Sequence, residues 1–110
     1  MNTLLLSTKL KNRIKKIPGD FTFFLKNITI NGEKRGCSGF IRNNHNNTYV
    51  YVDTERSVYG GVPNYMYRYA NNEKDYTGYR NRWADTLDEL AHGIENLLGS
   101  SPAEQHDTRI

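Results

Sequence analysis

The hydrophobic residues of this sequence repeat at two different spacings, and this change of period restricts the fold more than any other feature. Segments 21–25, 48–52 and 65–69 alternate with period two, which is typical of strands with one covered face. From Trp83 to Leu98 the apolar residues recur every three or four positions, as on one face of a helix. The sequence therefore predicts an α+β fold.

Turn signals divide the alternating region into candidate strands. Asn31-Gly32 favours a type I′ hairpin turn, because both residues tolerate a positive φ. The Asn-rich segment 43–47 and the Gly-Gly-Val-Pro segment 60–63 are the next two breaks. We expect strands at 21–30, 36–41, 48–52 and 65–69. The parity of the apolar residues switches at Lys26-Asn27, which predicts a β-bulge there or two partly covered faces. The glycines of 36–41 predict a bend or a close backbone approach.

Two helices flank these strands. Ser7 to Ile17 forms a short basic amphipathic helix, in which Ser7 is the expected cap and Pro18-Gly19 the expected end. The second helix carries the stripe from Trp83 to Leu98. Its expected signals are a capping box at Thr86 and Glu89 and a C′ glycine at Gly99.

The predicted architecture is an antiparallel sheet of three to four strands, with the basic N-terminal helix and the C-terminal amphipathic helix packed on one face. Residues 1–99 form the single domain, and residues 100–110 form a mobile tail without apolar pattern. The helix stripe should pack on one side of the sheet. The expected pairing sets Trp83, Leu87, Leu90, Ile94 and Leu97 against Phe23, Ile28, Phe40 and Val50.

Length and composition exclude several classes of protein. A chain of 110 residues excludes a multidomain enzyme. The lone Cys37 excludes an internal disulfide and a Cys-rich zinc site. The longest apolar run, Leu4–Leu6, is too short for a membrane span or a signal peptide. We therefore expect a cytoplasmic protein that does not bind a membrane.

The net charge of +3 conceals an asymmetry along the chain. Residues 1–52 hold nine basic and two acidic side chains, a local charge of +7. Residues 53–110 hold six basic and ten acidic side chains, a local charge of −4. Whether the two charges also separate in space depends on the fold.

Catalytic and metal-binding patterns are weak. Cys37 with His45 is the only nucleophile and base worth naming, and a buried strand thiol beside an exposed loop imidazole explains the pair better. Glu89 and His92 share a helix face at metal-ligand spacing, but an ordinary surface pair is the better explanation. We expect no enzymatic activity, no cofactor and no metal site.

Basic and aromatic residues give two binding hypotheses. Nucleic acid could contact a basic set beside a row of tyrosines, namely Lys11, Lys15, Lys16, Lys34, Arg35 and Arg42 with Tyr65, Tyr67 and Tyr69. The alternative is a solvated helix face and half-buried cross-strand packing. Segment 76–82, in which Arg80 and Arg82 stand beside Tyr79 and the following Trp83, has the Tyr, Arg and Trp mixture of protein interface hot spots, although packing at the entry of the helix explains it equally well.

Protein binding fits the whole composition best, because small size, exposed Tyr and Asn and opposite charges suit polar contacts around aromatic anchors. The predicted protein-binding residues are Tyr65, Tyr67, Tyr69, Tyr79, Arg80 and Arg82, with Lys11, Lys15 and Lys16 as an electrostatic arm. A small nucleic-acid-binding regulator that uses the basic half and the tyrosine row stays the alternative.

Residues 75–98 (DYTGYRNRWADTLDELAHGIENLL) and 21–43 (FTFFLKNITINGEKRGCSGFIRN) carry a family resemblance. The chain resembles small domains encoded by mobile elements of Gram-positive bacteria, of the large polyvalent protein-associated type, and stand-alone proteins encoded beside anti-restriction and anti-CRISPR genes. The resemblance covers roughly residues 20–98. It implies an antagonist of host defence in a bacterial cytoplasm, most concretely an anti-CRISPR protein that binds Cas9 or its guide complex. It carries over no individual functional residue.

The charge limits how such an antagonist could act. A DNA mimic needs a dense acidic surface, and a net charge of +3 disfavours it. Two routes remain. In the first, the acidic helix face docks on a basic groove of the effector protein. In the second, the basic half contacts guide RNA or DNA while the other half contacts the effector protein. Either route would block the effector sterically.

Overall fold

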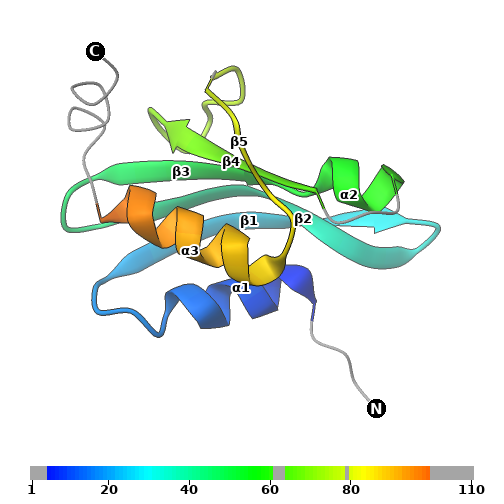
Figure 1. The fold of residues 1–110 in the computed structure, drawn as a ribbon, viewed down its shortest axis with the longest axis horizontal. Coiled ribbons are helices and arrows are strands. Elements are labelled where there is room, and N and C mark those ends of the chain that lie inside the picture. The colour runs from blue at the N-terminus through cyan, green and yellow to red at the C-terminus, as the bar shows by residue number, and fades with distance from the viewer. Residues whose placement is uncertain (1–4, 61–63, 79, 100–110) are drawn as a thin grey trace.

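Five antiparallel strands follow one another across a single sheet in the order β1-β2-β3-β4-β5 (Figure 1). The computed structural model describes residues 5–60, 64–78 and 80–99. The α+β fold is confirmed, and the sheet has one strand more than the predicted three to four. The elements in chain order are α1 (Leu6–Ile14), β1 (Phe21–Ile30), β2 (Glu33–Asn43), β3 (Thr48–Asp53), α2 (Glu55–Gly60), β4 (Tyr65–Ala70), β5 (Arg82–Ala84) and α3 (Leu87–Leu98).

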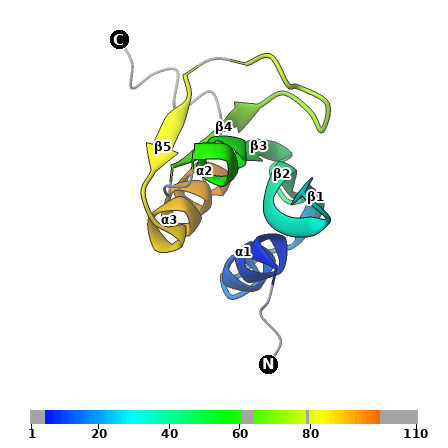
Figure 2. The ribbon, with the colours of Figure 1, turned by 90° about the vertical axis from the view of Figure 1, so that its right-hand side faces the viewer.

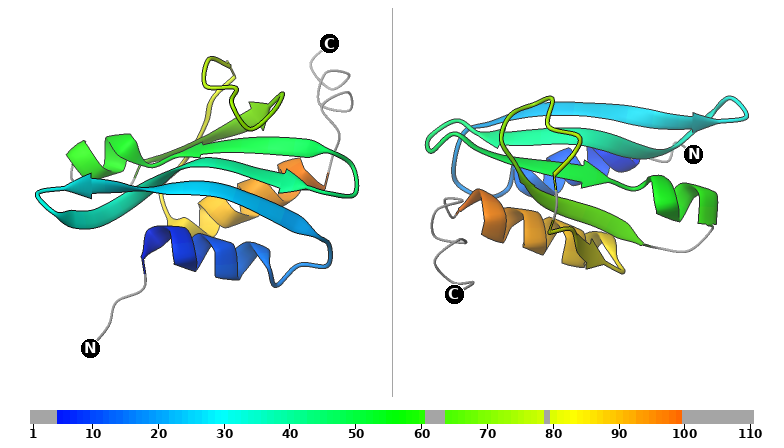
Figure 3. Two further views of the ribbon diagram at one scale, coloured as in Figure 1. Left: turned by 180° about the vertical axis from the view of Figure 1, so that it is seen from behind. Right: turned by 90° about the horizontal axis from the view of Figure 1, so that it is seen from above.

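The helices divide the molecule into layers. Helices α1 and α3 lie side by side on one face of the sheet, which we call the inner face (Figures 1 and 2). Of the described segments outside the strands, the opposite, outer face carries the short helix α2 and the β4–β5 connection, which crosses over the strands when the molecule is seen from above (Figure 3). Within the described residues, no helix is long and apolar enough to cross a membrane. The predicted tail, residues 100–110, lies outside the described residues.

The strand register sets which side chains face the helices. Ile41, Val50 and Tyr69 form one cross-strand row on the inner face. This row packs in the inner hydrophobic core, whose fully buried members include Leu10 and Ile14 of α1. Helix α3 adds Leu90, Ala91, Ile94, Leu97 and Leu98. An ion pair between Arg13 and Asp88 joins the two helices across this layer.

Three expected core contacts are wrong. Phe40 lies on the outer face, where it packs with Tyr51 and Ala70. Ile28 lies on the same face, beside Gly36 and α2. Trp83 belongs to β5 and is half-exposed, because α3 begins only at Leu87. The helical spacing of Trp83 relative to Leu87 is coincidental, since a three-residue strand is too short to show a period of its own.

Most turn and cap signals agree with the structure. Asn31 and Gly32 both have positive φ values, 52° and 83°, as the predicted hairpin requires. The Thr86 side chain accepts a hydrogen bond from the Glu89 backbone N–H at 3.1 Å. A Cβ at Gly39 would collide with the Phe24 carbonyl, so the predicted close backbone approach is confirmed there.

Other local predictions need correction. Helix α1 ends at Ile14 rather than Ile17, and Ser7 lies inside it. The Ser7 hydroxyl donates to Asn27 Oδ1 at 2.7 Å, so it ties the helix to β1 instead of capping it. The register is regular at Lys26-Asn27, so the change of parity there reflects the second alternative, two partly covered faces; the bulge lies between Ile28 and Thr29. Helix α2 was not predicted, although Thr54 followed by Glu55 is a helix-start signal.

Candidate functional site

The outer face collects the most exposed aromatic side chains of the described residues. Among the described residues, four large hydrophobic side chains are exposed: Phe24 (38%), Tyr59 (66%), Tyr76 (54%) and Trp83 (49%). All four belong to this face or to the segments that lie on it. Phe24 is the register partner of Phe40, Tyr76 packs on Phe40, and Tyr59 and Trp83 line one hollow together. We call this set the outer aromatic surface.

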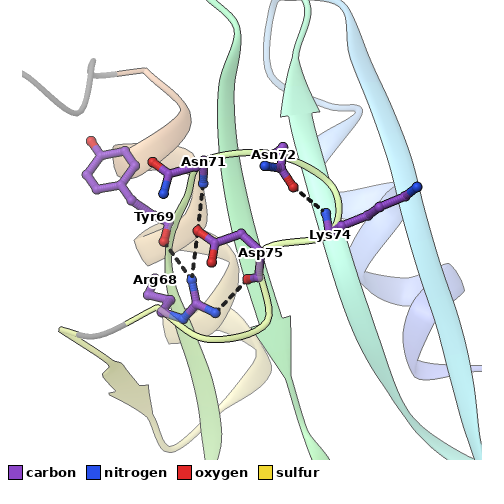
Figure 4. Close-up of polar contacts among 6 residues, drawn as sticks. All are labelled: Arg68, Tyr69, Asn71, Asn72, Lys74 and Asp75. Carbon is purple, nitrogen blue, oxygen red and sulfur yellow. Dashed lines mark hydrogen bonds and ion pairs between the residues drawn. The ribbon is translucent and has the colours of Figure 1, made fainter.

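A buried arginine fixes the β4–β5 connection on this surface (Figure 4). Arg68 is only 1% exposed, and its guanidinium lies 4.7 Å from the centre of the Tyr51 ring. It donates to the Tyr69 carbonyl at 3.0 Å and to the Asp75 carbonyl at 2.7 Å. The Asp75 carboxylate lies 3.8 Å away and also accepts from the Asn71 N–H. The start of the connection is therefore held by one charged side chain.

The anchored connection positions Tyr76. Its ring meets Phe40 edge-on, with the centroids 5.1 Å apart, and Tyr51 with the centroids 5.8 Å apart. Gly78 follows, and a Cβ there would collide with the Arg68 guanidinium. Arg80 has a φ of 69°, which is unfavourable for a residue other than glycine. A non-glycine residue in this region is held by its surroundings and often marks a functional segment.

Helix α2 borders the other side of the outer aromatic surface. The Thr54 hydroxyl accepts from the Cys37 N–H at 2.8 Å and donates to the Cys37 carbonyl at 3.0 Å, which ties the start of α2 to β2. Gly36 has no side chain, and this allows Val58 to approach the sheet. The position of α2 thus depends on two residues of β2 that the sequence marks only as small.

A hollow of about 290 Å³ lies between α2 and the β4–β5 strands. Its lining combines two carboxylates, two aromatic rings and a thioether, from Asp53, Glu55, Tyr59, Met66 and Trp83. We call it the acidic-aromatic pocket. Sequence reasoning missed it, because its residues come from four elements and α2 gave only a weak signal.

The predicted tyrosine row lies on the other side of the sheet. Tyr65, Tyr67 and Tyr69 are partly buried and pack against the inner core. A Cβ at Gly93 of α3 would collide with the Tyr67 ring, so helix and ring are in close contact. Packing therefore accounts for this row, and its role in binding stays a prediction.

The other predicted protein-binding residues are separated. Arg82 lies with the tyrosine row, and its guanidinium is 5.9 Å from the centre of the Tyr69 ring. Arg80 is exposed in the β4–β5 connection. Tyr79 lies outside the described residues.

The predicted basic set occupies three places. Lys11 of α1 and Lys15, directly after it, hold their Nζ atoms 6.0 and 5.8 Å from the centre of the Phe23 ring, and the next residue, Lys16, is exposed. Lys34 and Arg35 are exposed near the β1–β2 hairpin.

Arg42, at the third place, lies in β2 and forms hydrogen bonds within the fold. It donates to Asn44 Oδ1 at 2.9 Å and to Asn47 Oδ1 at 3.1 Å, so it holds the Asn-rich turn. The structure therefore does not bring the predicted basic residues into one patch with the tyrosine row.

The weak catalytic candidates are also apart. Cys37 is fully buried, and burial, with the charge of Asp53, raises the pKa of its thiol to about 12. His45 follows the end of β2, about 20 Å along the strand from Cys37 at ~3.3 Å per residue. His92 lies 3.7 Å from Glu95 rather than pairing with Glu89. The described residues contain no cluster of three metal-ligating side chains.

Comparison of the chain with protein-family models, curated proteins and solved structures finds no match.

Proposed function

We propose that this chain is a non-enzymatic binding protein that docks its outer aromatic surface onto a protein partner. The observation that carries the proposal is the gathering of all four exposed large hydrophobic side chains of the described residues on one side of the sheet. Exposed apolar side chains scattered singly need no explanation, whereas a group on one face marks an interaction surface.

The anchoring of this surface supports the same role. Arg68 and Asp75 hold Tyr76 against the sheet, and Thr54 holds α2, so the aromatic groups need little ordering when a partner binds. Rigid tyrosine and tryptophan rings also supply contact area at a low cost in conformational entropy. An anchored aromatic face is therefore suited to act by occupying a partner's surface.

The resemblance described above supplies the most concrete partner, the type II CRISPR effector Cas9 alone or with its guide RNA. In this proposal the protein comes from a mobile element, acts in the bacterial cytoplasm and inhibits the effector sterically. Docking on the effector protein has more support than contact of the basic half with nucleic acid, because the outer aromatic surface lies apart from the basic residues of α1. In this proposal the outer aromatic surface, rather than the acidic face of α3, makes the contact. The nucleic-acid alternative has less support, since the tyrosines it would use for stacking are partly buried against the core.

Size-exclusion chromatography of the full chain with Cas9, with and without guide RNA, tests the proposal, together with a DNA-cleavage assay. A complex that elutes as one peak and loses cleavage is the expected result. No complex under either condition, with cleavage intact, would sink the choice of Cas9 as partner.

Matched variants test the surface. Phe24→Ser with Trp83→Ser removes two exposed aromatic rings and should weaken binding at least ~30-fold, since hot-spot truncations cost about 2 kcal/mol or more. His92→Ala is the control, because it removes an exposed ring from α3 on the opposite side of the sheet. Equal affinity of both variants would contradict the assignment of the outer face.

A further inference from the structure

We propose that the acidic-aromatic pocket receives an arginine side chain from the surface of the protein partner. This inference deepens the proposed function and rests on it. It assigns a ligand chemistry to Asp53, Glu55, Tyr59, Met66 and Trp83, a group that the sequence did not single out.

The lining suits a guanidinium group. Tyr59 and Trp83 are 66% and 49% exposed, so each presents part of its side chain to solvent at the pocket. A guanidinium is planar and weakly hydrated, and it stacks on aromatic faces while its N–H groups bind carboxylates in pairs. Both kinds of partner line this one hollow, and the polarizable thioether of Met66 is also in its lining.

The two pocket carboxylates can accept further hydrogen bonds. Asp53 Oδ1 accepts from the Glu55 N–H at 2.8 Å, and Oδ2 accepts from the Tyr51 hydroxyl at 3.3 Å. A carboxylate offers about four lone-pair positions, so these two bonds orient Asp53 without saturating it. Glu55 is exposed at the start of α2. One carboxylate is therefore held in place while the other can adjust.

Charge around the pocket favours a cation. Among the side chains that the structure describes, neither Asp53 nor Glu55 forms an ion pair. The basic residue on the same cross-strand row, Lys26, lies two strands from Asp53, about 10 Å at ~4.8 Å per strand. The Arg68 guanidinium is turned to the Asp75 carbonyl. A cation from a partner would complement the two acidic groups.

The size of the pocket favours a single side chain. Its volume of about 290 Å³ is just below the range for small-molecule sites, roughly 300–1,000 Å³. A long side chain presented by a protein surface fits that space better than a cofactor does. The position of the pocket at the border of the outer aromatic surface is also where a docked partner would reach it.

Trp83 provides a direct test, because it is the only tryptophan of the chain and lines the pocket. The full chain is titrated with the blocked tripeptide acetyl-Gly-Arg-Gly-amide while tryptophan emission is recorded at constant ionic strength. The control probe replaces arginine with citrulline, which has nearly the same shape and no charge. The expected result is a saturable change in emission with the arginine peptide and binding weaker by about tenfold or more with citrulline.

Charge variants separate the pocket from general electrostatics. Asp53→Asn and Glu55→Gln should each weaken binding of the arginine peptide, Asp53→Asn while keeping an acceptor for the Glu55 N–H. Glu95→Gln is the control, because it removes the same charge from α3 on the other side of the sheet. Circular dichroism melting of each variant verifies the fold.

The outcomes distinguish this inference from the proposed function. No saturable response, an equal response to citrulline, or equal losses in Glu95→Gln and the pocket variants would overturn the arginine pocket, whether or not Cas9 binds. A specific response to the arginine peptide together with no Cas9 complex would support the pocket and reject the partner instead.

Discussion

Replacing Arg68 by methionine should release the β4–β5 connection from the sheet. Methionine keeps the apolar stem under Tyr51 and removes the guanidinium, which makes two hydrogen bonds to backbone carbonyls. A hydrogen bond from a charged donor contributes about 1.5–3 kcal/mol, and removing one partner of a buried ion pair costs about 3–5 kcal/mol. We expect a loss of about 3–5 kcal/mol, because Arg68 is buried while Asp75 is 14% exposed and stays partly hydrated.

Two measurements test this prediction. Urea unfolding at neutral pH gives the change in the free energy of unfolding from the midpoint and slope. Limited trypsin digestion reports on the β4–β5 connection itself, because the exposed Lys74 lies in it. The rate of cleavage after Lys74 should rise by a larger factor than the population of globally unfolded protein. A loss below about 1 kcal/mol with unchanged cleavage after Lys74 would refute the reasoning.

Gly78→Ala gives an internal control for the same cluster. The new methyl group would collide with the Arg68 guanidinium, so the substitution should cost about 1–3 kcal/mol in the native chain. In the Arg68→Met background the cost should largely disappear, because the obstructing group is absent. Equal costs in both backgrounds would show that Arg68 does not fill this space.

Three further predictions concern the fold. Gly93→Ala should destabilise the fold by about 1–3 kcal/mol despite the better helix propensity of alanine, because the new methyl group would collide with the Tyr67 ring. In a Tyr67→Ala background the same substitution should be stabilising, and thermal melting checks the change of sign. Gly32→Ala should cost about 1 kcal/mol in urea unfolding because its φ is 83°, whereas Gly60→Ala, where a Cβ meets nothing within 4 Å, should stay within about 0.5 kcal/mol. The pKa of the Cys37 thiol is about 12 in the fold, against its ordinary value of 9.0, because the fold favours the neutral thiol. The resulting stabilisation of the fold is fully present below pH 9 and is lost as pH rises towards 12. The urea midpoint should therefore fall above pH 9, and Cys37→Ala should reduce that fall; an identical pH dependence in the variant would contradict burial as its cause.

The elements with strong local signals could be predicted from the sequence. The Asn31-Gly32 turn needs two positive φ values, and these two residues accept them at little cost. The stripe of α3 and its Thr86 cap are likewise local properties. Such features follow from neighbouring residues, so no knowledge of the tertiary fold is required.

The candidate site could not be predicted, because it depends on which face each strand turns outward. Tyr51 and Tyr69 look alike in the sequence, yet the register places one on the outer face and the other against the core. Trp83 has helical spacing to Leu87 but belongs to a strand. Arginine is usually a surface residue, and Arg68 anchors the β4–β5 connection only because that connection folds over it. Tertiary contacts decide all of these roles.

Hydrogen–deuterium exchange of the chain, alone and bound to Cas9 with guide RNA, tests the central claim most directly. If the outer face is the docking surface, backbone amides in α2 and in the β4–β5 connection will gain protection in the complex. Amides of α1 and α3, on the opposite side of the sheet, will then exchange as in the free chain. Protection confined to α1 and α3, with α2 and the connection unchanged, would contradict the account.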